Sequence, residues 1–424
     1  MADLIPKERY ISREFVDLEI ERLWPRVWQI ACREEEVPRP GDYVEYVIGD
    51  QSIFVVRGAD GSLGAYYNAC LHRGTKLASG AGSFAEGRIK CSYHGWCYDL
   101  SGCVTEVPDR SEFPDLPVDL RLGEVRAEAW GGFVFVNMDP NAEPLLDFLD
   151  PIPSLLAPYR LDEMRFRAYQ TLVLPANWKA VLDAFNEGYH VQGAHPQILP
   201  WTDDVSIAYE QYDRHARYGR LEGARRELRG SPRLENSDVD EGEILAGLVA
   251  GLGGAFLKDE KAVVDELRAA DLPPGTMLGA FQERRMKLLA DRGFDVSGFT
   301  PDRIISAEDV YWFPNMVGPI YPGSALLFRT RPNGLDPDSC LKDIWVLEWR
   351  PPGDERPMPE RRFYADWTAK KWDAVSTQDY ENLVKVQAGM HSRGFRGLRL
   401  NERQEGNIAH MHRVLDRYLR SGDD

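Results

Sequence analysis

Short runs rich in β-branched and aromatic residues recur along the chain, bounded by Gly, Asp and Asn, and such runs predict β-strands. They lie at residues 43–48, 53–57, 132–136, 169–174, 325–329 and 344–349. Apolar residues at close to helical spacing predict helices instead, at 1–40, 178–191 and much of 359–419. The pattern therefore predicts an α+β chain that starts with helices, continues as a β-rich module and then mixes strands with helices.

The chain has 424 residues, which is long for one compact core and favours two domains. We expect N-terminal helices over residues 1–40 that pack on the second domain, a β-rich domain over 41–160, and the second domain over 161–424. Residues 213–300 are charged and mostly helical, and they interrupt two strand-like regions. We interpret this segment as a helical insertion that covers a pocket.

Charge and cysteine content limit the partners and the compartment. The net charge of −17 argues against a nucleic-acid partner, because binding to nucleic acid needs clustered Lys and Arg. The longest apolar run, Ile244–Leu257, is shorter than the roughly 18 residues of a membrane span and contains glycines, and the N-terminus has no signal-peptide pattern. Six cysteines in a chain of this size indicate a reducing compartment. We expect a cytoplasmic protein without a membrane segment.

Two cysteines and two histidines form the most informative motif. Cys70 and His72 are separated by one residue, and Cys91 and His94 follow further along, separated by two. This four-ligand set is typical of a Rieske [2Fe–2S] cluster, in which two thiolates hold one iron and two imidazoles hold the other. A glycine directly follows each loop, where the backbone must come close to the cluster. Structural zinc is the alternative, although zinc fingers pair Cys with Cys and His with His.

A second possible metal site lies in the segment predicted as a helix over 178–191 and just beyond it. His190 and His195 are five residues apart, so on an ideal helix they point about 140° apart around the axis. Both can bind one ion only if the helix widens or ends between them, and Gly193 and Pro196 favour such a break. Two imidazoles with one carboxylate make the facial triad of a non-haem Fe(II) oxygenase.

These motifs resemble those of a known family. Cys70–Gly74 (C-x-H-R-G), Cys91–Trp96 (C-x-Y-H-G-W), Glu187–Pro196 (E-G-Y-H-x4-H-P) and Thr377–Met390 are similar to segments of Rieske non-haem iron oxygenases, the α subunits of aromatic-ring-hydroxylating dioxygenases. The resemblance implies an N-terminal Rieske [2Fe–2S] domain and a C-terminal catalytic domain of the helix-grip (START/SRPBCC-like) fold with an antiparallel sheet. Only the insertion of 213–300 lies outside the resemblance.

The resemblance also implies roles for single acids. Asp379 matches the third iron ligand of the family, with Glu381 as a less favoured alternative. Glu187, three residues before His190, matches the acid that links this ligand to a cluster histidine of the neighbouring subunit, where naphthalene-type dioxygenases have Asp. On a helix, Asp183 would share the face of Glu187 and His190. It is either a second bridging acid or a hydrogen-bond partner.

The implied function is the terminal oxygenase of a Rieske system, with one [2Fe–2S] cluster and one mononuclear Fe(II) as cofactors. No G-x-G-x-x-G motif opens a helix after a strand, so NAD(P)H should act through a separate reductase, with a possible ferredoxin. The resemblance implies O2 as co-substrate, an aromatic or other apolar substrate, dihydroxylation or monooxygenation, and a homotrimer. Oxidative N- or O-dealkylation is the alternative, and a non-enzymatic Rieske electron carrier is a remote one.

Overall fold

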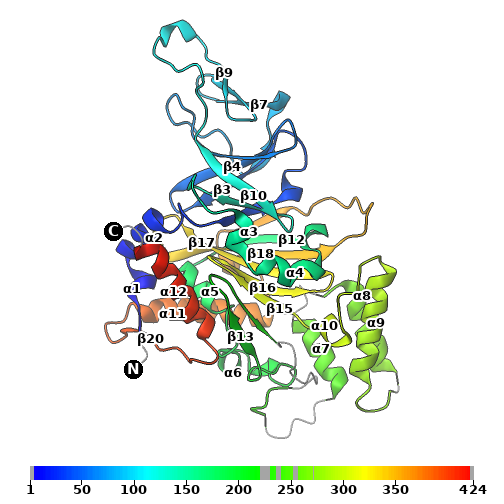
Figure 1. The fold of residues 1–424 in the computed structure, drawn as a ribbon. Coiled ribbons are helices and arrows are strands. Elements are labelled where there is room, and N and C mark those ends of the chain that lie inside the picture. The colour runs from blue at the N-terminus through cyan, green and yellow to red at the C-terminus, as the bar shows by residue number, and fades with distance from the viewer. Residues whose placement is uncertain (1–3, 220–229, 235–239, 252–255, 271, 421–424) are drawn as a thin grey trace. The chain divides into compact units, whose positions relative to one another are not determined.

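The structure is a computed structural model that describes residues 4–219, 230–234, 240–251, 256–270 and 272–420 (Figure 1). The chain divides into two compact units. The small unit comprises Asp17–Leu149 and the C-terminal end from Tyr418, and the large unit comprises Asp150–Arg417 with the N-terminal segment up to Val16. Each unit contains its own sheet and its own buried core.

The small unit contains a seven-stranded and a three-stranded antiparallel sheet. The larger sheet has the order β2 (Gln29–Arg33), β11 (Phe133–Asn137), β10 (Glu124–Trp130), β5 (Leu63–Tyr67), β4 (Gln51–Arg57), β3 (Asp42–Ile48) and β6 (Ala81–Ser83). The smaller one consists of β7 (Arg88–Lys90), β8 (Cys97–Asp99) and β9 (Val104–Glu106). Strands β3, β4 and β11 confirm the three strands predicted for this region.

The N-terminal segment differs from the expected run of helices. Helices α1 (Glu8–Ile11) and α2 (Arg13–Arg22) are present, but β2 follows them as a fully buried strand. Pro25 interrupts the helical pattern, and the apolar run after it is too short for its periodicity to separate a strand from a helix. Because β2 pairs with β11, residues from Asp17 onward belong to the small unit and not to the second domain.

The large unit is built on an eight-stranded sheet. Its order is β13 (Ala208–Gln211), β14 (Ala216–Gly219), β15 (Glu308–Trp312), β16 (Met316–Tyr321), β17 (Ser324–Asn333), β18 (Asp336–Trp349), β12 (Met164–Leu174) and β19 (Arg361–Tyr364). All neighbours are antiparallel except β12 and β19, which are parallel. The three strands predicted in this region are confirmed as parts of β12, β17 and β18, and the antiparallel sheet agrees with the expected fold class.

Two helices carry the segments of interest. Helix α5 (Trp178–Asp183) begins at the N-cap Asn177, whose side chain accepts a hydrogen bond from the Lys179 backbone N–H. The prediction of a helix over 178–191 is too long, because α5 ends at Asp183 and the following turn contains Asn186 and Gly188, which have low helix propensity. Only the short α6 (Val191–Ala194) resumes the helix, so Asp183, Glu187 and His190 do not share one helical face. Helix α11 (Ala374–Met390) is one of the two C-terminal helices, with α12 (Gly406–Arg420).

The insertion expected over 213–300 is mainly helical where the structure describes it. It contains α7 (Glu241–Gly251), α8 (Lys258–Ala269) and α9 (Met277–Asp291), while its first residues include strand β14. The helices share a core that reaches Tyr321 at the end of β16. A Cβ at Gly247 or Gly251 would overlap the Trp201 ring, so the glycines of α7 allow this ring to pack closely on the helix.

Candidate metal centres

The two Cys-His loops of the small unit have the same backbone geometry. The Cys70 N–H donates to the Thr75 carbonyl at 2.8 Å, and the Cys91 N–H donates to the Trp96 carbonyl at 2.8 Å. Each loop then turns at a glycine with a left-handed backbone, at φ +77° for Gly74 and φ +74° for Gly95. A side chain at either glycine would be strained, which explains why both loops use this residue.

The four candidate ligands are arranged in two pairs. Both thiols are buried, whereas His72 is partly exposed and His94 is exposed, with their Nδ1 atoms 3.1 Å apart. The Trp96 ring stacks on the His72 ring at 5.2 Å between centroids. An inner pair of thiols and an outer pair of converging imidazole nitrogens is the donor set that a Rieske [2Fe–2S] cluster requires.

The electrostatics of the loops favour a thiolate at Cys91. Burial alone would raise the pKa of this thiol, but backbone N–H groups of Tyr93 and His94 point at the sulfur and lower the pKa below its usual value. The Tyr98 hydroxyl lies 3.1 Å from Cys70 Sγ and also accepts a hydrogen bond from the Leu71 N–H. The loops therefore supply donors to the sulfur atoms, as metal-bound thiolates need.

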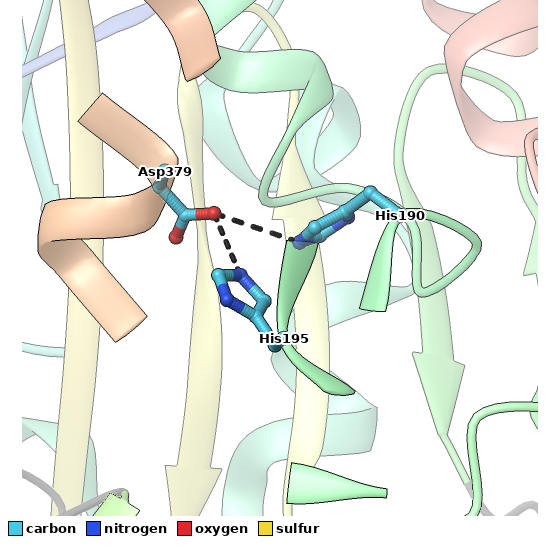
Figure 2. A group of neighbouring side chains, drawn as sticks. All are labelled: His190, His195 and Asp379. Atoms are coloured by element: carbon cyan, nitrogen blue, oxygen red, sulfur yellow. Dashed lines mark hydrogen bonds and ion pairs between the residues drawn. The ribbon is translucent and has the colours of Figure 1, made fainter. Parts of the chain in front are cut away.

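In the large unit, His190, His195 and Asp379 converge on one point (Figure 2). One ligand atom from each lies within 4.8 Å of the others. The Asp379 Oδ1 atom is 2.7 Å from His195 Nε2 and 3.7 Å from His190 Nε2. His190 and His195 flank the short helix α6, and Asp379 comes from α11, so the broken helix brings together the two histidines that an intact one would separate.

The other nitrogen of each imidazole is held by a side chain of the same region. His190 Nδ1 lies 2.6 Å from Glu187 Oε1, and His195 Nδ1 lies 2.8 Å from Gln378 Oε1. These contacts orient the rings so that both Nε2 atoms point toward Asp379, which is how proteins usually prepare histidine for a metal. The sequence analysis did not single out Gln378, although its position directly before Asp379 is a signal that could have found it.

The charges of the site fit a cation. Burial alone would lower the pKa of His190 and of His195, but the hydrogen bonds and charges of Glu187 and Asp379 raise both pKa values above the usual range. The two imidazoles and the carboxylate therefore favour positive charge at the point where they converge. The donor set of two nitrogens and one oxygen suits non-haem Fe(II), and Glu381 is exposed on α11 and is not one of the three converging side chains.

Asp183 lies near this site but contacts other groups. Its Oδ2 atom accepts a hydrogen bond from the Tyr10 hydroxyl at 2.7 Å, and this hydroxyl is also 2.7 Å from His412 Nε2. Burial raises the pKa of Asp183 to about 7. Of the two roles open for Asp183, the structure shows hydrogen bonding to Tyr10. A cavity of about 200 Å³ is lined by Asp183 together with Glu187, His190 and Asp379.

Two family models cover most of the chain. One, described as the Rieske [2Fe-2S] domain, matches residues 27–118. The other, described as the ring hydroxylating alpha subunit (catalytic domain), matches residues 161–249 and 253–421. The chain belongs to the ring-hydroxylating alpha subunit family. The match of the first model selects the iron–sulfur cluster over a zinc finger, and the alpha subunit has a Rieske cluster and a non-haem iron as its cofactors.

Curated relatives of this alpha subunit include oxygenases with different substrates. The glycine betaine monooxygenase oxygenase subunit of Chromohalobacter salexigens is 35% identical over 46% of this chain and 44% of that protein. The carnitine monooxygenase oxygenase subunit of Escherichia coli is 35% identical over 48% and 54%. The benzene 1,2-dioxygenase subunit alpha of Pseudomonas putida is 32% identical over 45% and 43%. The aligned part thus spans about half the length of these relatives.

Solved structures support the fold along almost the whole alpha subunit. A quaternary ammonium Rieske monooxygenase in complex with L-carnitine has a TM-score of 0.68 at 19% identity and covers 98% of this chain and 96% of its own. A naphthalene 1,2-dioxygenase mutant bound to phenanthrene has a TM-score of 0.69 at 21% identity, covering 99% and 93%. Among the helices that the structure describes, none is both long and apolar enough to cross a lipid bilayer.

Proposed function

We propose that this alpha subunit is the terminal oxygenase of a Rieske system. A separate NAD(P)H-dependent reductase, directly or through a ferredoxin, supplies the electrons, and O2 is the co-substrate. When bound, the cluster supplies one-electron transfer and the mononuclear iron supplies O2 activation. The observation that carries the proposal is the convergence of His190, His195 and Asp379 on one point.

The residues have distinct parts in this proposal. Cys70, Cys91, His72 and His94 hold the cluster, while His190, His195 and Asp379 hold the iron. Glu187 fixes the His190 ring and lies in the lining of the adjoining cavity, where it can contact a group from outside the large unit. We propose that this group is a cluster histidine of a neighbouring subunit in a homotrimer. A related solved structure is described as revealing inter-subunit electron transfer, which supports this arrangement.

Two reaction outcomes compete under the proposal. Hydroxylation of an aromatic or other apolar compound, as monooxygenation or dihydroxylation, is the first. Oxidative N-dealkylation is the second, and the specific observation in its favour is that the relatives include carnitine and glycine betaine monooxygenase subunits. Both need the same metals and differ in which substrate carbon is held beside the iron.

A single-turnover experiment tests the function. The purified protein, loaded with cluster and iron, is chemically reduced and exposed to oxygen-18 gas with aromatic and N-alkylated compounds, and products are analysed by mass spectrometry. Labelled product in the wild type, and none in an Asp379→Ala variant that keeps its cluster spectrum, is the expected result. Iron analysis adds a check, since an oxygenase needs three irons per chain and an electron carrier only two. Two irons per chain and no labelled product would contradict the proposal.

A further inference from the structure

A buried lysine lies beside the candidate iron site, and the described residues include no acidic partner for it. Lys342 of β18 is only 1% exposed. Its Nζ atom lies 3.4 Å from the centroid of the Phe185 ring, 4.4 Å from that of Phe328 and 4.8 Å from that of Tyr380. Aromatic faces attract a cation, and most strongly when water is excluded. The three rings thus form a cage around the protein's own ammonium group.

The polar atoms in this cage are not satisfied by the described part of the protein. Within that part, Nζ of Lys342 has no hydrogen bond to a protein acceptor and no ion pair with a carboxylate. Thr330 is the register partner of Lys342 on the neighbouring strand, so both side chains lie on the same face of the sheet. Its Oγ1 atom is buried and also lacks a hydrogen-bond partner there. Two donors on the same face of the sheet are therefore without an acceptor among the described residues.

Two of the three rings of the cage are not fully enclosed by protein. Phe185 and Phe328 are only partly buried, and their ring centroids lie 4.6 Å apart. The cage is also continuous in sequence with the metal ligands: Tyr380 directly follows Asp379, and Phe185 lies in the turn that leads to His190. A small molecule bound at Lys342 would therefore be held next to the iron site.

The charge balance favours an anion in this space. Burial lowers the pKa of Lys342 to about 7, while the negative charge of Asp379 opposes this shift. A divalent cation bound to Asp379 would cancel that attraction and lower the pKa of Lys342 further, toward the neutral amine, unless an anion lies beside Nζ. A negatively charged ligand would restore the balance and accept hydrogen bonds from both donors.

We propose that Lys342, with the Thr330 hydroxyl as a second donor, binds an anionic group of the substrate, with carboxylate as the matching chemistry. The inference rests on the proposed oxygenase function and specifies its substrate class. A quaternary ammonium group does not fit the same cage, since the rings already surround an ammonium and a second cation would be repelled. The substrate is then held by its carboxylate while an adjoining carbon lies near the iron.

The test compares matched ligands on the protein loaded with cluster and iron. Benzoate, phenylacetate and hexanoate are each titrated by calorimetry beside their methyl esters, with tetramethylammonium as the cationic probe. We expect the wild type to bind at least one acid about tenfold or more tightly than its ester, as for a charge-assisted hydrogen bond. Lys342→Met should remove this preference and leave ester binding unchanged, and Thr330→Val should reduce it in part.

Lys370 offers a matched control. Its Nζ also lies over aromatic rings, 4.1 Å from the Trp372 centroid, but it is hydrogen-bonded to Gln170, so Lys370→Met should leave the preference intact. Equal binding of acid and ester by the wild type, or tighter binding of tetramethylammonium, would overturn the inference even if Lys342→Met does not fold. If the acids bind in a Lys342-dependent way but gain no oxygen-18, only the oxygenase function is contradicted. If oxygen-18 is incorporated only into neutral or cationic compounds, only the anion site is contradicted.

Discussion

Replacement of Glu187 by Gln is the most direct test of how the iron site is held. The carboxylate makes three contacts: Oε1 accepts from His190 Nδ1 at 2.6 Å, and Oε2 accepts from the backbone N–H groups of His190, at 3.1 Å, and Tyr189. A glutamine amide has one oxygen and one NH2 group. If the amide oxygen accepts from His190 Nδ1, the NH2 group faces the two backbone N–H groups, which then lose their acceptor. If the oxygen accepts from the backbone N–H groups instead, the hydrogen bond to the imidazole is lost.

The loss of iron affinity in Glu187→Gln can be estimated from the role of Glu187 in orienting the His190 ring. Removing the partner of a metal-binding imidazole typically weakens metal affinity about 10- to 100-fold, which is roughly 1.4–2.7 kcal/mol. We expect Glu187→Gln to raise the dissociation constant for Fe(II) in this range, while the Rieske absorption spectrum remains that of the wild type. At saturating iron, electron delivery from the cluster should still fall under the proposed function, because the carboxylate proposed to contact the cluster histidine is neutralised.

The assay titrates iron into metal-free protein that retains its cluster, followed by single-turnover oxidation of the cluster at saturating iron. Glu381→Gln is the control, since this acid is exposed on the same helix as Asp379 and should change neither quantity. Iron affinity within twofold of the wild type, together with normal cluster oxidation, would refute the reasoning about Glu187.

Three further predictions follow from the site and its surroundings. Because the two ligand imidazoles have raised pKa values, Fe(II) affinity should fall as pH is lowered through those values, and a pH-independent dissociation constant would contradict this. The folded pKa of Asp183, about 7, exceeds its ordinary value of 3.8, so this carboxyl should make wild-type stability fall as pH rises between them, by up to about 4 kcal/mol, and chemical denaturation should show a shallower slope for Asp183→Asn. In Gly247→Val, the new Cβ would meet Trp201 at 2.3 Å, and thermal unfolding should show a loss of about 1–3 kcal/mol. Gly279→Ala is its control, because no atom of the described residues lies within 4 Å of that Cβ, and it should be neutral or stabilising.

The strands were predictable because apolar and polar side chains alternate along them, but their ends were not. The strand predicted at residues 344–349 begins at Asp336 in the structure, and this earlier part contains Lys342. A lysine is an unexpected residue on the buried face of a sheet. The sequence analysis therefore predicted neither the burial of Lys342 nor its position beside the iron site. Gln378 was missed for a different reason, since its role depends on His195, which lies far away in the sequence.

The spacing of His190 and His195 predicts that the helix must break between them. It does not predict which residues stabilise the broken segment. The irregular turn after α5 exposes backbone groups that need partners. In the structure, the Tyr209 hydroxyl accepts from the Gly188 N–H at 3.1 Å, and the Tyr218 hydroxyl donates to the Phe185 carbonyl at 2.8 Å. These tyrosines stack on the β13–β14 hairpin with centroids 5.7 Å apart. The turn that carries His190 is thus held by a hairpin from another part of the sequence. The local sequence pattern around His190 cannot predict these tyrosine contacts.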